Sequence, residues 1–140
     1  MAAAIMDKLC EENNLDVRIE SAGMFATDGE KASPEAVEAI KKYDVDLSDH
    51  LSQQITPELI EKSDMIITMT EAHKMVLQDM AKEKTCTLCE VADMSGDIED
   101  PFGGDVDDYI EVADKLYIAL TQLCNKLEEI QKNQEEQETL

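Results

Sequence analysis

The feature that most constrains the fold is a short apolar run in the middle of the chain, Met65-Ile66-Ile67-Thr68-Met69. Nearly every side chain in this run is apolar, so the strand that it predicts must be covered on both faces. Strands of this kind belong to parallel sheets, because the helices that connect parallel strands lie over the faces of the sheet. The run therefore predicts a buried strand in a small parallel sheet.

Two similar helix starts precede this run. Ser33-Pro34-Glu35 and Thr56-Pro57-Glu58 each place a hydroxyl side chain before a first-turn proline and an acid, a pattern typical of helix N-termini. We expect these helices to cover residues 34–42 and 57–61. The spacing of apolar residues predicts further helices over residues 2–12, 71–80 and 106–130.

Two weaker strands complete the predicted pattern. Val17 to Ser21 alternates apolar and polar side chains and ends at a turn, and Thr85 to Cys89 has a strand-like composition. Strands and helices then alternate along the chain, which predicts an α/β fold with three layers, a small parallel sheet flanked by helices. In such folds ligands bind outside the carboxyl ends of the strands.

The length of 140 residues fits one domain with a core of its own. Residues 131–140 are acidic and almost free of apolar side chains, so we expect a disordered tail after a domain that covers residues 1–130.

Charge and cysteine content narrow the class of protein. The formal net charge is −21 and Arg18 is the only arginine, which argues against binding to nucleic acid. No apolar run approaches the roughly 20 residues of a membrane-spanning helix, and the first residues do not have the pattern of a secretion signal. The four cysteines do not have the spacing of a secreted disulfide framework. We therefore expect a soluble cytoplasmic protein.

Three polar residues are candidates for a functional site. Asp100 lies in a glycine-rich loop before Pro101 and Phe102, where a carboxyl group held at the mouth of a cleft, with its pKa raised by apolar neighbours, can act as a general acid. Gly, Asp and Pro are also ordinary turn residues, so this loop alone does not establish the role. Ser21 and His50 stand near predicted element ends, where either side chain can order a loop by hydrogen bonding.

The pair Cys86-x-x-Cys89 invites a redox or zinc interpretation. A four-cysteine zinc site needs a second matched pair, and Cys10 and Cys124 stand singly. A redox pair would normally open a helix, whereas this pair lies in a strand-like run whose alternate side chains face opposite ways. We therefore interpret both as packing cysteines and predict no metal.

Several stretches together resemble the low-molecular-weight protein-tyrosine phosphatases over nearly the entire chain. Ser21-Ala22-Gly23 resembles the end of the second strand of that family, and Ser33 to Val37 resembles the helix that follows. Asp100-Pro101 is the most specific match. Phe102-Gly103-Gly104 stands where many tyrosine-directed members have tyrosines, and is more similar to the bacterial protein-arginine phosphatase branch.

The resemblance implies a fold and an activity. Members of this family remove phosphate from proteins through a phosphocysteine intermediate, without a metal or organic cofactor. Their nucleophile lies in a Cys-x5-Arg loop, and an aspartic acid protonates the leaving group. By resemblance Asp100 is this general acid and Phe102 contacts the substrate, while Ser21 and His50 lie beneath the loop and orient it.

The Cys-x5-Arg loop has no counterpart among these 140 residues. The residues six positions after the four cysteines are Asp16, Ala92, Ser95 and Ile130. The resemblance therefore implies that the first, central strand of the sheet and the loop after it are missing, and that the chain is N-terminally truncated. We expect marginal stability and no activity for the chain alone. A start site assigned too far downstream, or a shortened gene, explains this more readily than an evolved pseudoenzyme.

Three functional interpretations follow. The first is a phosphatase acting on phosphotyrosine or phosphoarginine in proteins, which the sequence does not distinguish. The second is a non-catalytic phosphatase-like module that binds a partner through its acidic surface or exposed sheet. The third is thiol-coupled arsenate reduction, which in proteins of similar fold uses a relay of further cysteines. Thr70 to Lys74, where such a relay would begin, contains no cysteine, which disfavours this interpretation.

Overall fold

The computed structural model describes residues 1–24 and 26–139, and for residues 137–139 it describes the backbone alone. Leu140, the last residue of the expected tail, lies outside the described residues. The elements in chain order are α1 (Ala2–Glu12), α2 (Pro34–Ala39), the 3-10 turn η1 (Lys41–Tyr43), α3 (Pro57–Lys62), β1 (Ile66–Thr68), α4 (Glu71–Ala81), the 3-10 turn η2 (Lys82–Lys84), β2 (Thr85–Thr87), α5 (Leu88–Val91) and α6 (Val106–Thr139).

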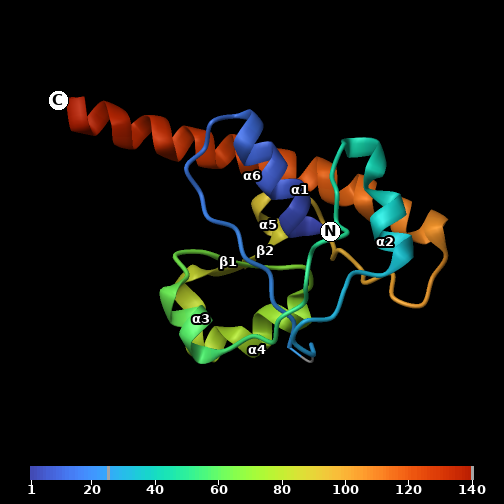
Figure 1. Ribbon diagram of the computed structural model, residues 1–140. Coiled ribbons are helices and arrows are strands. Elements are labelled where there is room, and N and C mark those ends of the chain that lie inside the picture. Colours follow the sequence, from blue (N-terminus) through green and yellow to red (C-terminus); the bar gives the residue numbers. More distant parts are fainter. Residues whose placement is uncertain (25, 140) are drawn as a thin grey trace.

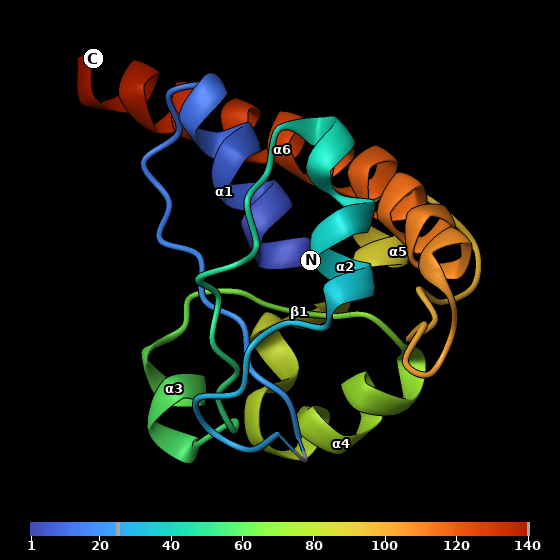
Figure 2. The same ribbon diagram turned by 45° about the vertical axis from the view of Figure 1, so that its right-hand side comes forward.

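The described residues form a two-stranded parallel sheet, in which β1 pairs with β2. Ile67 lies opposite Cys86 at the centre of the pairing. Figures 1 and 2 show α1, α2 and α6 on one side of this sheet and α3 and α4 on the other. The expected fold class, a small parallel sheet between helices, is confirmed.

Both predicted helix starts are confirmed by their capping bonds. The backbone N–H of Ala36 donates to Ser33 Oγ at 3.3 Å, and the backbone N–H of Leu59 donates to Thr56 Oγ1 at 3.1 Å. Each cap is followed by a proline in the first turn. The hydroxyl groups therefore satisfy N–H groups that lack a partner within the helix.

Most of the core lies between α6 and the helices that pack on it, α1, α2 and α5. The apolar side chains of α6 recur at intervals of three and four residues, so they lie on one face of the helix, and this face is buried. The buried residues of α6 are Tyr109, Ala113, Leu116, Ala119, Leu120, Leu123 and Cys124. A second, smaller cluster between α3 and α4 is formed by Ile60, Leu77 and Ala81.

The strand expected over Val17 to Ser21 is not present. This segment follows α1 without strand pairing, and its backbone makes no hydrogen bond to other backbone groups among the described residues. Pairing begins only at Gly23, whose N–H donates to Gln53 O and whose carbonyl accepts from Ile55 N, both at 3.0 Å. A strand requires a neighbouring strand to bond with, and alternation of side chains does not provide one.

The strand expected from Thr85 to Cys89 is shorter than predicted, because Thr87 ends it. The Thr87 hydroxyl accepts a hydrogen bond from Glu90 N at 3.0 Å and thereby caps α5. Cys86 therefore lies on β2, whereas Cys89 is buried on α5.

The last helix is longer than expected, since α6 continues to Thr139. Residues 131–139, which we expected to be disordered, are helical. The sequence after Asp105 contains no glycine or proline, and Glu, Gln and Lys are good helix formers. A helix already fixed by its buried face extends easily through such residues, because each added residue needs no new nucleation. None of the described helices, α6 included, is both long and apolar enough to cross a membrane.

Candidate functional site

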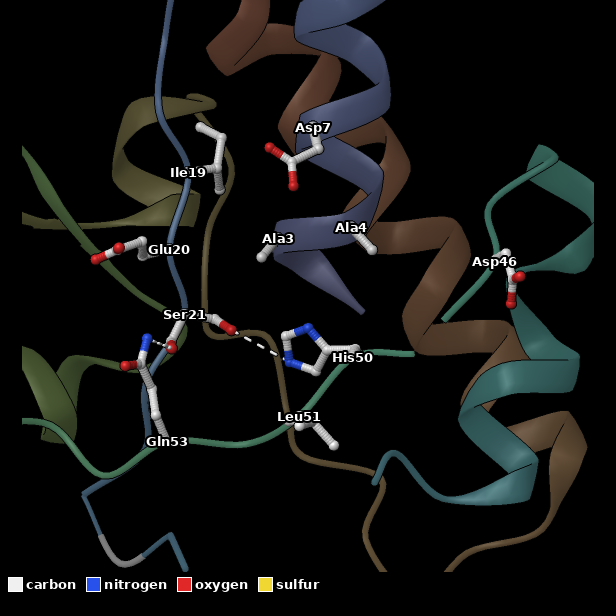
Figure 3. A pocket seen from close by; sticks show the side chains of 10 residues that line it. All are labelled: Ala3, Ala4, Asp7, Ile19, Glu20, Ser21, Asp46, His50, Leu51 and Gln53. Atoms are coloured by element: carbon white, nitrogen blue, oxygen red, sulfur yellow. Dashed lines mark hydrogen bonds between the residues drawn. The ribbon is translucent and has the colours of Figure 1, made fainter. Parts of the chain in front are cut away.

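A cavity of about 370 Å³ opens beside the first turns of α1. Three parts of the chain form its wall, namely α1, the extended segment 19–21 and the loop 46–53. Figure 3 shows the lining side chains from these parts around a common space. They are Ala3, Ala4, Asp7, Ile19, Glu20, Ser21, Asp46, His50, Leu51 and Gln53.

Ser21 and His50, both singled out from the sequence, meet at this cavity. Ser21 Oγ lies 3.4 Å from His50 Nε2, and the dashed line between them in Figure 3 marks this hydrogen bond. The backbone N–H of His50 donates to Leu47 O at 3.1 Å, which fixes the loop on the histidine side. The pair therefore ties the extended segment after α1 to the loop before α3.

Two glutamines that the sequence analysis did not select hold the backbone of Ser21 and Met24 in place. Gln53 Nε2 donates to Ser21 O at 2.7 Å, and Gln54 Nε2 donates to Met24 O at 2.5 Å. Nothing in a single sequence marks a loop glutamine as such a support, because its partner is a backbone carbonyl some thirty residues away. Only the fold identifies them.

The lining of the cavity is acidic. Its charged lining residues, Asp7, Glu20 and Asp46, are all carboxylates. Burial raises the pKa of Asp7, and His50 opposes this effect. Burial also lowers the pKa of His50, and the nearby N-terminal ammonium lowers it further. His50 is therefore neutral at pH 7 and available as a hydrogen-bond partner.

The proposed general acid, Asp100, lies in the loop between α5 and α6. Its side chain is exposed, and its Oδ1 accepts a hydrogen bond from Phe102 N at 3.0 Å. Gly104 N donates to Pro101 O at 2.8 Å, and Gly103 has a φ of 85°, which favours glycine. Asp100 does not line the cavity of Ser21 and His50. The structure thus brings two of the four predicted site residues together.

Phe102 is the fourth predicted site residue, and it projects into solvent from the same loop with 87% of its surface exposed. The loop itself is anchored to the sheet side. Ile98 N donates to Met69 O at 2.9 Å, and Glu71 N donates to Asp97 Oδ1 at 2.9 Å. The Phe102 ring is therefore held in solvent by an anchored loop.

The four cysteines are free thiols. Cys10, Cys89 and Cys124 are buried, and Cys86 is half-buried. Burial raises the pKa of Cys10 to about 11, with further contributions from Cys124 and Asp7, and burial also raises the pKa values of Cys86 and Cys124. Over the described part of the chain, no three His, Cys, Asp or Glu side chains are grouped to hold a metal ion.

Comparison with known proteins identifies relatives over most of the chain. The profile of the family described as low molecular weight phosphotyrosine protein phosphatase matches residues 1–136. A protein-arginine-phosphatase of Bacillus subtilis is 38% identical over 131 residues, which cover 91% of this chain and 87% of the relative. A low-molecular-weight protein-tyrosine-phosphatase, PtpB of Staphylococcus haemolyticus, is 32% identical over 121 residues, with 85% and 86% coverage.

Solved structures give the same picture. A mutant of the YwlE arginine phosphatase with a phosphorylated active-site serine superposes with a TM-score of 0.85 at 37% identity. The match covers 91% of this chain and 86% of that one. The YwlE arginine phosphatase from Geobacillus stearothermophilus superposes with a TM-score of 0.84 at 34% identity, with 94% and 86% coverage.

Proposed function

The chain belongs to the low-molecular-weight phosphotyrosine protein phosphatase family, and from this premise we propose that its site removes phosphate from tyrosine or arginine side chains of proteins. The observation that carries the proposal is the position of the cavity at the N-terminal end of α1. The first turn of α1 has no side-chain cap, and Ala3 and Ala4 of this turn line the cavity. Free N–H groups and the helix dipole make such an end favourable for a phosphate.

The proposed chemistry has two steps, transfer of the phosphate to a cysteine and its release by water. A cysteine thiolate attacks phosphorus, so that a sulfur–phosphorus bond forms and the bond from phosphorus to the tyrosine oxygen or arginine nitrogen breaks. Asp100 donates a proton to that oxygen or nitrogen, and water then hydrolyses the phosphocysteine. Ser21 and His50 orient the loop that carries the thiolate, and Phe102 contacts the substrate side chain. No metal or organic cofactor enters this scheme.

We further propose that the 140 residues alone are inactive. They contain no Cys-x5-Arg series, and the thiols that they do contain are buried or have raised pKa values. A buried thiol of high pKa is a poor nucleophile. The activity therefore requires a segment that supplies the thiolate and the arginine beside the start of α1.

The relatives support two different substrates, phosphoarginine and phosphotyrosine. The Bacillus and Geobacillus relatives are named arginine phosphatases, at 38% and 34% identity, whereas the Staphylococcus relative is named a tyrosine phosphatase at 32%. Phe102, in place of the tyrosines of many tyrosine-directed members, favours phosphoarginine. The four free thiols are consistent with work in the cytoplasm.

A hydrolysis assay tests the proposal. The 140-residue chain and a version preceded by a family-type strand and Cys-x5-Arg loop are each given a phosphotyrosine peptide, a phosphoarginine peptide and an aryl phosphate. We expect turnover by the longer version alone, and a loss of about 10²- to 10⁴-fold in kcat after Asp100→Asn, the usual contribution of a general acid. Family-like turnover by the short chain, or full activity of Asp100→Asn, would contradict the proposal.

One observation favours the second candidate, a non-catalytic binding module. Among the described residues, β1 pairs with β2 alone, and the backbone from Val17 to Ala22 bonds to no other backbone group. Unpaired backbone of this kind favours pairing with another chain. Circular dichroism with thermal melting separates the candidates. Cooperative melting of the short chain supports the module, whereas cooperative melting of the longer version alone supports the enzyme.

A further inference from the structure

Gln53 bonds to Ser21 and to Gly23, two residues further along the chain. Its side-chain Nε2 donates to the carbonyl of Ser21 at 2.7 Å, and its own carbonyl accepts from the N–H of Gly23 at 3.0 Å. Both interactions join the loop before α3 to the extended segment after α1, and Figure 3 shows the first of them beside the cavity. Gln53 therefore fixes the backbone that carries the Ser21 hydroxyl.

These contacts matter because the extended segment has few others. The backbone from Val17 to Ala22 makes no hydrogen bond to backbone groups within the described ranges. The nearest backbone hydrogen bonds between this segment and the loop are those of Gly23, two residues after Ser21. Without the Gln53 amide, the position of the Ser21 side chain would depend on the weak 3.4 Å contact with His50 itself.

The direction of the hydrogen bond between Ser21 and His50 depends on which ring nitrogen carries the proton. Nε2 faces the Ser21 hydroxyl, whereas in Figure 3 the other ring nitrogen is turned towards the first turn of α1. A ring proton on Nδ1 leaves Nε2 as an acceptor. The serine hydroxyl can then donate to Nε2.

We propose that Gln53 is a positioning residue, which holds Ser21 so that its hydroxyl donates to Nε2 of His50 and the imidazole keeps its proton on Nδ1. Gln53 acts through Ser21 and does not itself contact the ring. The importance of this arrangement for phosphate removal rests on the proposed function, whereas the arrangement itself follows from the contacts of the three residues.

The charges around His50 must be kept constant in any test. The carboxylates of Asp7 on α1, Glu20 on the extended segment and Asp46 on the same loop line the cavity, and the N-terminal ammonium acts on the ring as well. Replacement of Gln53 by methionine retains the length of the side chain, adds no charge and removes the donor. A change in the titration of His50 then reports the contact with Ser21.

Gln54 provides a matched control. Its Nε2 donates to Met24 O at 2.5 Å, so it makes the same type of bond three residues after Ser21. Its side chain does not line the cavity. Gln54→Met therefore removes a comparable support without releasing Ser21.

The experiment is nitrogen-15 NMR of the His50 ring over a pH titration. It uses the 140-residue chain and its variants Gln53→Met, Gln54→Met, Ser21→Ala and the double variant Ser21→Ala/Gln53→Met. In the wild type and in Gln54→Met we expect one neutral tautomer, with the proton on Nδ1. In Gln53→Met we expect a mixture of tautomers and a rise in the pKa of His50 of about half a unit, equivalent to a weak hydrogen bond to the neutral ring.

The double variant distinguishes positioning from general support. Because Gln53 acts through Ser21, Ser21→Ala/Gln53→Met is expected to titrate like Ser21→Ala, with no additional shift. The proposal is overturned if Gln53→Met titrates like the wild type, if Gln54→Met shifts as much, or if the two shifts add. None of these readings requires turnover, so a failed hydrolysis assay and a failed positioning role give different results.

Discussion

The two helical layers of the molecule are held together in different ways. The layer of α1, α2 and α6 encloses the main apolar cluster. Tyr43 reinforces its contacts, because its ring stacks on that of Tyr117 with the ring centroids 4.4 Å apart. The layer of α3 and α4 has a cluster of three buried residues, Ile60, Leu77 and Ala81. Hydrogen bonds from polar side chains to backbone carbonyls supply the remaining contacts of this layer. The comparison indicates that apolar burial stabilises one layer and a few hydrogen bonds position the other.

Substitutions in the two clusters give the largest expected difference. Ile40, which has no exposed surface, lies in the main cluster, whereas Leu77 lies in the small one. We expect Ile40→Ala to cost about 4 kcal/mol and Leu77→Ala about 2 kcal/mol, because a cavity near a thin layer collapses more easily. Urea unfolding of both variants measures the two losses. Equal losses would show that the layers are packed equally well.

A single lysine is expected to have the next largest effect. Lys84 Nζ donates to Ile60 O at 2.6 Å, Ser63 O at 2.7 Å and Glu61 O at 3.2 Å, and so joins η2 to the end of α3. We expect Lys84→Met to lower the free energy of unfolding by about 2 kcal/mol, as for hydrogen bonds to charged groups. Lys82, exposed on the same turn, is the control, and Lys82→Met should change it by less than about 0.5 kcal/mol. Similar losses in both variants would assign no special role to Lys84.

The same contrast explains what the sequence could predict. Ser33 and Thr56 predict the starts of their helices correctly, because a capping hydroxyl and a proline act within one turn. The apolar run around Ile67 likewise predicts a strand from local composition, and β1 lies there, but Ile66 and Ile67 are half-buried and only Thr68 is buried. Local chemistry thus determines these elements before any tertiary contact forms.

Non-local partners account for the expectations that were wrong. Val17 to Ser21 has the alternation of a strand, but pairing depends on a neighbour, and none bonds to its backbone among the described residues. Ser21 and His50 were selected from the sequence as candidates, whereas Gln53 was not, since its bond forms only where residues 21 and 53 are brought together. Asp100 stays outside the cavity lining, and its role remains a proposal.

Removal of the two matching caps is expected to have a smaller effect, and it sharpens the comparison. Ser33→Ala and Thr56→Ala each remove one capping bond, at a cost of about 1 kcal/mol. The loss in α2 should appear in global unfolding, because α2 packs directly on α6. The loss in α3 should appear mainly as faster local amide exchange within Pro57–Lys62. Hydrogen exchange of both variants measures this, and indistinguishable patterns would mean that the layers unfold as one unit.

The smallest expected effect is a pH dependence at the boundary between the layers. The pKa of His50 in the folded chain is lowered from 6.5, chiefly by burial. The fold therefore favours the neutral ring, so its contribution to stability is present above pH 6.5 and is lost as pH falls towards the lower folded value. Asp7 acts in the opposite sense, because its raised pKa makes its contribution decrease as pH rises.

A subtraction isolates the histidine from the other groups. Unfolding free energies of the wild type, His50→Gln and His73→Gln are compared between pH 7.5 and 5.5. His73 is exposed on α4 and serves as the control. The wild type and His73→Gln should lose stability on acidification more steeply than His50→Gln, because only the latter lacks the ring that must take up a proton on unfolding. Parallel curves for all three would mean that His50 titrates alike in both states, and that the cavity is wetter than its contacts indicate.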